Sequence, residues 1–127
     1  MNRGTEGSVG RILVVDDAAF ARVRTMRTLI EGGHEVLEAE SGPRAIELYE
    51  QHRPDLVLLD ITMPEMDGLQ ALAAIRRLDP NATVAMLTAV GHQSVVMDAI
   101  KGGARDFLVK PVEPQHLLDV VGRLLAH

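Results

Sequence analysis

Short runs of mainly apolar residues alternate along the chain with segments in which apolar residues recur every three or four positions. Most of the short runs are apolar throughout, which is typical of strands buried on both faces of a parallel sheet. The other segments have the spacing of helices that bury one side. The predicted strands cover residues 11–16, 35–39, 55–60, 83–87 and 105–109.

Glycine and proline mark most ends of the predicted helices. Gly32-Gly33 ends the first helix, in which Val23, Met26 and Ile30 are predicted to share the inner face. Proline is tolerated in the first helical turn and stops a helix elsewhere. The predicted helices cover residues 18–30, a segment between Pro43 and Pro54, 69–78, 92–101, and a segment that begins at Pro114.

Five strand–helix units joined by right-handed crossovers form a doubly wound α/β fold, a five-stranded parallel sheet with helices on both faces. We expect the flavodoxin-like strand order 2-1-3-4-5, which puts the first and third strands side by side. The second strand is more polar than the others, which suits the edge of a sheet. The predicted domain covers residues 11–127, and the glycine-rich residues 1–10 are expected to be a flexible arm.

Polar residues stand at the ends of the predicted strands. Asp16 and Asp17 end the first strand, Asp60 the third, Thr88 the fourth and Lys110 the fifth. In open α/β sheets, ligands bind beyond the carboxyl ends of the strands, so these residues are predicted to share one site. Three carboxylates brought together repel one another, and we therefore expect a cation between them.

Mg²⁺ suits these oxygen donors, with Mn²⁺ as the alternative ion, because it prefers octahedral oxygen ligands and usually takes one or two carboxylates. The Asp16-Asp17 pair can supply one direct ligand and one through water, and Asp60 can supply another oxygen. If Asp60 is also the nucleophile of a phosphoryl transfer, it forms an aspartyl phosphate. Lys110 would then neutralise charge on the transferring group, and the Thr88 hydroxyl would bond one of its oxygens.

Two further residues have predicted positioning roles. Gly68 closes the loop after Asp60, where a sharp turn needs a permissive backbone. Pro111 follows Lys110, and a cis bond there would direct the lysine into the pocket. Each residue also has a structural reading of its own: glycine and proline punctuate loops, and a strand-terminal aspartate often caps the next helix.

Composition narrows the possible functions. The chain of 127 residues fits one domain, and its 46% hydrophobic content excludes a disordered chain. A net charge of −5 with only 2% aromatic residues argues against direct nucleic-acid binding. The chain has no cysteine for disulfides or thiolate metal sites, and its five histidines are scattered and expected at the surface. With no apolar stretch of membrane-spanning length and no signal peptide, the expected location is the cytoplasm, without membrane insertion.

Four motifs resemble the signature of response-regulator receiver domains. They are Arg11-Ile-Leu-Val-Val-Asp-Asp17, Asp60-Ile-Thr-Met-Pro-Glu-Met-Asp-Gly68, Thr88-Ala89 and Lys110-Pro111. The resemblance runs over essentially the whole predicted domain. Three segments are similar to those of stand-alone chemotaxis regulators: Asp17-Ala-Ala-Phe20, Asp60-Ile-Thr-Met-Pro64 and Gly91-His-Gln93. The resemblance implies phosphorylation by a sensor histidine kinase, and self-catalysed phosphorylation and dephosphorylation instead of turnover of a separate substrate.

The resemblance also implies a role for each site residue. Asp60 corresponds to the phosphoacceptor, Asp17 to a direct Mg²⁺ ligand and Asp16 to a ligand through water. The backbone carbonyl of Thr62 is implied as a further ligand. The implied phosphate-binding pair is Lys110 with Thr88, and Thr88 is also the switch hydroxyl. The implied aromatic switch is Phe107, which would turn behind the hydroxyl and change the surface of the fourth helix, fifth strand and last helix.

The sequence leaves several functions open. The chain ends soon after its last helix, so we expect a monomer whose output is a partner protein, such as the flagellar motor switch. A phosphorelay intermediate or another single-domain regulator is the alternative. A Mg²⁺-dependent aspartyl phosphatase of the haloacid dehalogenase type would need an acid where Thr62 stands and a cap domain. A flavin carrier would need a phosphate-cradling loop where Asp16-Asp17 stand.

Overall fold

Five parallel strands form one sheet in the order β2-β1-β3-β4-β5, which confirms the predicted order. The computed structural model describes residues 9–89 and 93–126. Of the predicted arm, residues 1–8 lie outside this description, as does the predicted start of the fourth helix at His92. The strands are β1 (Arg11–Val15), β2 (Glu35–Ala39), β3 (Leu56–Asp60), β4 (Val84–Thr88) and β5 (Asp106–Val109).

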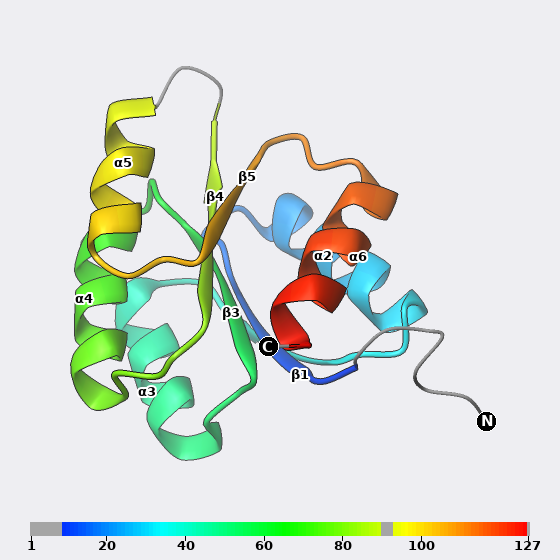
Figure 1. The fold of residues 1–127 in the computed structure, drawn as a ribbon, viewed down its shortest axis with the longest axis horizontal. Helices are drawn as coiled ribbons and strands as arrows, with labels where there is room; N and C mark the ends of the chain where they lie inside the picture. Colours follow the sequence, from blue (N-terminus) through cyan, green and yellow to red (C-terminus); the bar gives the residue numbers. More distant parts are fainter. Residues whose placement is uncertain (1–8, 90–92, 127) are drawn as a thin grey trace.

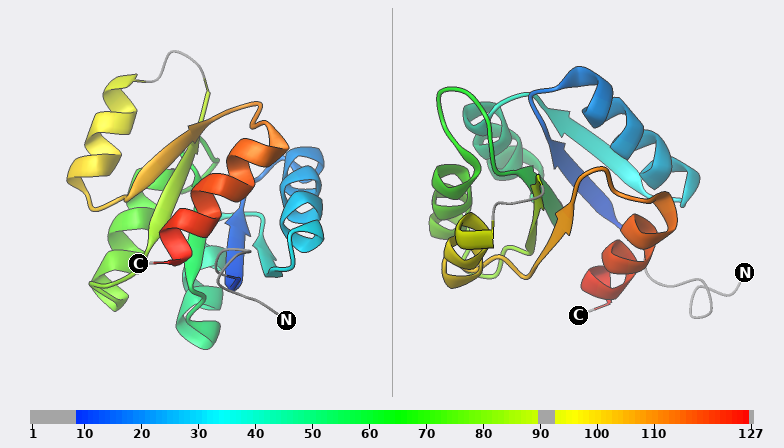
Figure 2. Two further views of the ribbon diagram at one scale, coloured as in Figure 1. Left: turned by 45° about the vertical axis from the view of Figure 1, so that its right-hand side comes forward. Right: turned by 90° about the horizontal axis from the view of Figure 1, so that it is seen from above.

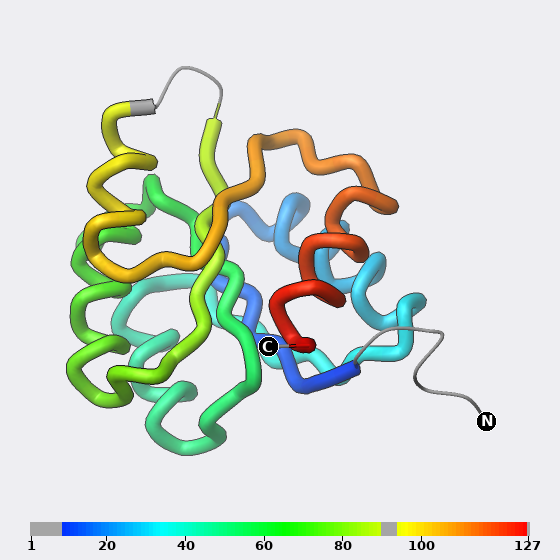
Figure 3. The backbone as a smooth tube through the Cα atoms, in the orientation of Figure 1, coloured from blue at the N-terminus to red at the C-terminus, as the bar shows by residue number. Residues whose placement is uncertain are grey.

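Helices cover both faces of the sheet, as predicted for a doubly wound fold (Figure 1). Seen from above, α3, α4 and α5 lie on one side of the strands, and α2 and α6 lie on the other (Figure 2). The tube view shows that the end of α6 comes back to the start of β1 (Figure 3). The helices are α2 (Ala19–Glu31), α3 (Gly42–His52), α4 (Gly68–Leu78), α5 (Gln93–Lys101) and α6 (Pro114–Leu125).

The sheet divides the apolar core into two layers. In β1 the side chains alternate: Leu13 and Val15 belong to the layer under α3, α4 and α5, while Ile12 and Val14 belong to the layer under α2 and α6. All four are fully buried. A strand buried on both faces needs apolar residues at every position, which explains the continuous runs in the sequence. Each such side chain contributes about 2 kcal/mol through burial.

Side-chain caps fix where α4 and α6 begin. Asp67 and Gln70 form a capping box, in which the Gln70 amide donates to Asp67 Oδ1 at 2.9 Å and the Asp67 amide donates to Gln70 Oε1 at 3.0 Å. Glu113 accepts a bond from the His116 amide at 2.8 Å. A cap of this kind contributes about 1 kcal/mol. Both capped helices follow loops that leave the carboxyl edge of the sheet, so the caps restrain those loops.

The predicted inner face of α2 is wrong for Val23 and Ile30, and Met26 alone of the three packs against the core. Val23 and Ile30 are 45% and 57% exposed, whereas Leu29 is fully buried and Met26 packs partly against the core. The inner face runs through Arg22, Met26 and Leu29, one residue out of phase with the predicted stripe. The prediction considered only apolar residues and so did not place Arg22, whose side chain is only 15% exposed, on the inner face.

None of the helices in residues 9–89 and 93–126 combines the length with the apolar character that crossing a bilayer requires.

Candidate functional site

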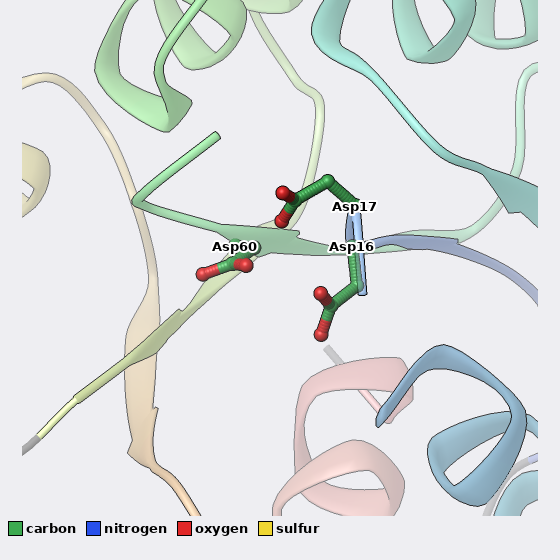
Figure 4. A group of neighbouring side chains, drawn as sticks. All are labelled: Asp16, Asp17 and Asp60. Atoms are coloured by element: carbon green, nitrogen blue, oxygen red, sulfur yellow. The ribbon is translucent and has the colours of Figure 1, made fainter. Parts of the chain in front are cut away.

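Three carboxylates converge beyond the carboxyl ends of β1 and β3. Asp16, Asp17 and Asp60 each offer an oxygen atom, and these oxygens lie within 4.8 Å of one another. Figure 4 shows the side chains of Asp16 and Asp17 leaving the end of β1 on opposite sides, with Asp60 beside them at the end of β3. Asp16 and Asp60 are buried, and Asp17 is exposed. The grouping that the strand-end positions predict is therefore present.

Strand register explains why these residues meet. Val15 of β1 pairs with Leu59 of β3, so the next residues, Asp16 and Asp60, leave neighbouring strands at the same height. On the other side of β3, Asp60 pairs with Leu87 of β4, so Thr88, which ends β4, lies one residue beyond that pair, and the Lys110 amide donates to the Thr88 carbonyl at 2.8 Å. Parallel strands in register place their carboxyl ends along one edge.

Lys110 lies across two of the three acids. Its Nζ is 2.9 Å from Asp16 Oδ2 and 3.2 Å from Asp60 Oδ2. The Lys110–Pro111 peptide bond is cis, as considered from the sequence. Asp17 completes the group of acids without a bond to this ammonium, so Lys110 pairs with only two of the three carboxylates. Such a set of hard oxygen donors fits a hard divalent cation, which would relieve the remaining repulsion.

Burial controls the protonation of the central acid. Burial raises the pKa of Asp60 to about 6, and the negative charge of Asp16 adds to this rise, while Lys110 opposes it. Burial also lowers the pKa of Lys110, but its bonds and charge contacts with Asp16 and Asp60 outweigh this, so that its pKa lies above the ordinary value. Asp60 at neutral pH is thus an ionised carboxylate held in a poorly solvated place, which suits a nucleophile.

The loop after Asp60 passes close to α4. A Cβ atom on Gly68 would lie 2.4 Å from the Asp60 carbonyl oxygen and 2.6 Å from the Ile61 Cα. Gly68 is therefore needed because of space, and the predicted reason, a permissive turn backbone, is wrong. Its amide donates to the Ile61 carbonyl at 2.7 Å. At the start of the same loop, the Thr62 amide lies 3.4 Å from Asp60 Oδ1.

The two predicted switch residues occupy different surroundings. Thr88 is 3% exposed, and its hydroxyl donates to the Ala89 carbonyl at 3.3 Å. Phe107 is 40% exposed on the edge strand β5, although its position in a strand suggests a core residue on composition alone. Its neighbour Leu108 is buried against α2 and α6, so the alternation of the strand turns Phe107 away from that layer.

Two residues to which the sequence assigned no site role are largely buried. Arg22 donates from Nη1 to the Asp16 carbonyl oxygen at 2.8 Å. His34 is 8% exposed, not at the surface as predicted, and its Nδ1 accepts a bond from the Gly10 amide at 3.2 Å. Burial lowers the pKa of His34. Neither residue belongs to a motif, and each is placed by contacts between distant segments.

The sequence model of the response regulator receiver domain matches residues 12–122. A curated relative, the chemotaxis protein CheY of Bacillus subtilis, is 50% identical over 116 residues, which cover 91% of this chain and 97% of the relative. Among solved structures, the receiver domain of NtrX from Brucella abortus superposes with a TM-score of 0.88 and 34% identity, covering 91% of this chain and 98% of that one.

A second solved structure bears on ligands and partners. It is the complex of CheX, CheY, BeF3 and Mg from Borrelia burgdorferi, and its matching chain is 36% identical, with a TM-score of 0.83. The match covers 87% of this chain and 85% of that chain. The match to the family model, over residues 12–122, includes the edge of the sheet where the three carboxylates lie.

Proposed function

The chain belongs to the response regulator receiver domain family of two-component signalling, and on this premise we propose that Asp60 accepts a phosphoryl group from a sensor histidine kinase. The observation that carries the proposal is the placement of Lys110, whose ammonium contacts the buried carboxylates of both Asp16 and Asp60. A carboxylate nucleophile beside a fixed cation, with two more acids at the same edge, suits phosphoryl transfer.

The transfer is a substitution at phosphorus. An Asp60 carboxylate oxygen forms a bond to phosphorus as the bond from phosphorus to the imidazole nitrogen of the kinase breaks, and the bonding pair stays on that nitrogen. Lys110 is within reach of the new phosphoryl oxygens, and the Thr88 hydroxyl is the second donor on the same edge. Hydrolysis later breaks the bond between phosphorus and Asp60 by attack of water, which releases phosphate and restores the carboxylate.

We assign the metal site to the same acids. Asp17 and Asp60 would bind Mg²⁺ directly, Asp16 through water, and the Thr62 backbone carbonyl would supply a further oxygen. Mn²⁺ has similar ligand preferences and would substitute. When bound, the ion supplies positive charge that offsets the negative charge of the phosphoryl group.

The proposed output surface lies on α5, β5 and α6. Met97 and Ile100 of α5 are 56% and 40% exposed, and Phe107 and Val109 of β5 are 40% and 41% exposed. Large apolar side chains exposed on adjoining elements favour partner binding. Phosphorylation would draw Thr88 inward and let Phe107 turn behind it, which changes this surface. Moving this surface from mostly inactive to mostly active requires about 5.5 kcal/mol of differential stabilisation. One phosphoryl group adds only about −1.5 to −2 charges, so we expect partial activation.

Chemotaxis is the pathway that we propose, since the curated relative described above is a chemotaxis protein. The partner would be a protein of the flagellar motor switch. A CheX protein is a second candidate, because the Borrelia structure is a complex of CheY with CheX. A phosphorelay, in which Asp60 passes its phosphoryl group to a histidine of another protein, uses the same site and is the alternative.

Intact-mass measurement tests the phosphoacceptor. We expect the protein to gain one phosphoryl group from acetyl phosphate with Mg²⁺, to gain none in EDTA, and to lose the group on treatment with hydroxylamine, which cleaves acyl phosphates. Asp60→Asn should gain none, whereas Asp98→Asn, an exposed acid on α5, should behave as wild type. A persistent mass gain in Asp60→Asn would contradict the proposal.

The output is tested with the phosphorylated protein and an immobilised flagellar switch protein. Binding should strengthen on phosphorylation and weaken in Ile100→Glu on α5. Phe20→Glu is the matched control, because Phe20 is 76% exposed on α2, outside the proposed surface. Equal binding by the phosphorylated and unphosphorylated forms, with rapid phosphoryl transfer to a histidine phosphotransfer protein, would favour the phosphorelay.

A further inference from the structure

Arg22 connects the end of β1 to the neighbouring strand. Its Nη1 donates to the backbone carbonyl oxygen of Asp16 at 2.8 Å, and its Nε donates to Oε1 of Glu38 in β2 at 2.7 Å. The arginine side chain is 15% exposed, and that of Glu38 is 49% exposed. A guanidinium presents its donors in a rigid fork, so the bond to Glu38 restricts the direction of the bond to Asp16.

The bonded carbonyl belongs to the peptide unit that joins Asp16 to Asp17. This unit is planar, so rotation about the Cα–C bond of Asp16 moves the carbonyl oxygen and the Cα of Asp17 together. The Asp16 side chain has its own restraints, because Oδ1 accepts a bond from the Ala18 amide at 3.0 Å and Oδ2 contacts Lys110. The exposed Asp17 side chain makes no hydrogen bond to the described residues, so only its backbone is restrained, and the backbone sets the range of positions that its carboxylate can reach.

We propose that Arg22 is a positioning residue for the metal site, which acts through the Asp16 carbonyl to fix the Asp17 carboxylate, and that Glu38 holds Arg22 in place. The inference rests on the proposed function, in which Asp17 is a direct Mg²⁺ ligand. It adds a residue pair outside the four motifs, on an element and a strand that supply none of the acids.

The charge of Arg22 acts in the opposite direction, since a cation near the site repels Mg²⁺. The carboxylate of Glu38 at 2.7 Å offsets this charge, and the guanidinium faces a carbonyl, not the open side where Asp17 lies. Positioning should therefore dominate. An ordinary surface ion pair would have little effect on a neighbouring site, but here one of the two bonds ends on the main chain of a site residue.

Calorimetric titration of the metal-free protein with Mg²⁺ tests the inference. We expect Arg22→Ala to weaken Mg²⁺ binding about tenfold, the lower limit for removing a residue that orients a ligand. Glu38→Gln should weaken Mg²⁺ binding about threefold, because the substitution loosens Arg22 and leaves the positive charge of its guanidinium without a carboxylate partner. Arg27→Ala is the matched control, since Arg27 is exposed on the same helix. Arg22→Lys should restore part of the affinity.

A second measurement separates positioning from general loss of structure. In phosphorylation by acetyl phosphate, Arg22→Ala should need about tenfold more Mg²⁺ for half-maximal rate. Its rate at saturating Mg²⁺ should stay within about twofold of wild type, because Asp60, Lys110 and Thr88 are unchanged. A purely structural role would lower the melting temperature and leave the Mg²⁺ midpoint in place.

The outcomes separate this inference from the proposed function. Unchanged Mg²⁺ affinity in both Arg22→Ala and Glu38→Gln overturns the role of Arg22 and leaves phosphorylation of Asp60 intact. If Arg22→Ala does not fold, Glu38→Gln decides alone, because Glu38 is half-exposed and its change keeps an oxygen acceptor. Failure of the wild-type protein to gain a phosphoryl group would instead overturn the proposed function.

Discussion

The two ends of the sheet use charge differently. At the amino end, Arg11 pairs with Glu35 at 3.1 Å, with side chains 43% and 72% exposed, so each charge has an opposite partner in water. At the carboxyl end, Asp16 and Asp60 are buried and share the single ammonium of Lys110, and Asp17 adds a third carboxylate to the group. Solvated pairs are nearly neutral for stability, whereas buried like charges are costly. The carboxyl end is therefore arranged for binding at the expense of stability.

The largest effect is expected from Gly68, the first residue of α4, which packs closely against the main chain of Asp60. In Gly68→Ala the new Cβ would lie 2.4 Å from a backbone oxygen, so the loop must move. We expect a loss of about 3 kcal/mol in the free energy of unfolding and slower phosphorylation, measured by denaturant titration and by mass. Gly122→Ala has open space and should stabilise α6 by about 0.5 kcal/mol; equal effects at both sites would contradict this account.

Removing the charge of Asp60 tests the cost of the carboxyl-end acids. Burial and Asp16 raise the pKa of Asp60 to about 6, so at pH 7 its ionised form costs more free energy in the folded protein than in the unfolded chain. Asp60→Asn should therefore raise the free energy of unfolding in EDTA by about 2 kcal/mol at pH 7. Urea titrations with and without EDTA provide the measurement. A less stable Asp60→Asn would show that the contact with Lys110 outweighs burial.

His34 gives the amino end a smaller, pH-dependent contribution. Burial lowers its pKa, so the folded protein takes up a proton less readily than the unfolded chain. The stability of the native state should be full above the unfolded histidine pKa, about 6.5, and fall as the pH drops below it. Thermal melts from pH 7.5 to 5.5 should show a weaker fall in His34→Gln. Parallel curves for the two proteins would exclude this histidine as a source of acid sensitivity.

The smallest effect is expected at the Arg11–Glu35 pair. Both side chains are exposed, so Glu35→Gln should change the free energy of unfolding by no more than about 0.5 kcal/mol. High salt should reduce even this difference, because screening acts on solvated charges. A loss comparable to that from Gly68→Ala would remove the contrast between the two ends of the sheet.

The sequence predicts features that depend on local pattern and on a general rule of parallel sheets. Continuous apolar runs identify β1 and β3. Because the carboxyl ends of parallel strands meet at one edge, the sequence alone predicts that Asp16, Asp60 and Lys110 lie together. Strand order follows because short right-handed connections leave few arrangements. This part of the site is a consequence of topology.

Residues positioned by contacts between distant segments could not be predicted in the same way. Arg22 lies on the inner face of α2 because its guanidinium meets a carbonyl on β1 and a glutamate on β2, which no helical periodicity reports. His34 is buried because the start of β1 covers it. The exposure of Phe107 follows from the place of β5 at the sheet edge. Glycine is needed at position 68 because the first residue of α4 packs against the main chain of Asp60 and Ile61.

The unequal exposure of the three acids has a consequence for kinetics. Asp16 and Asp60 are buried at the base of the site, and Asp17 is exposed to solvent. A cation held as proposed would enter and leave past Asp17 without opening the apolar core, so exchange would be fast compared with unfolding. The fraction of protein with bound metal would then follow the free concentration of the ion at each moment and would not depend on earlier concentrations.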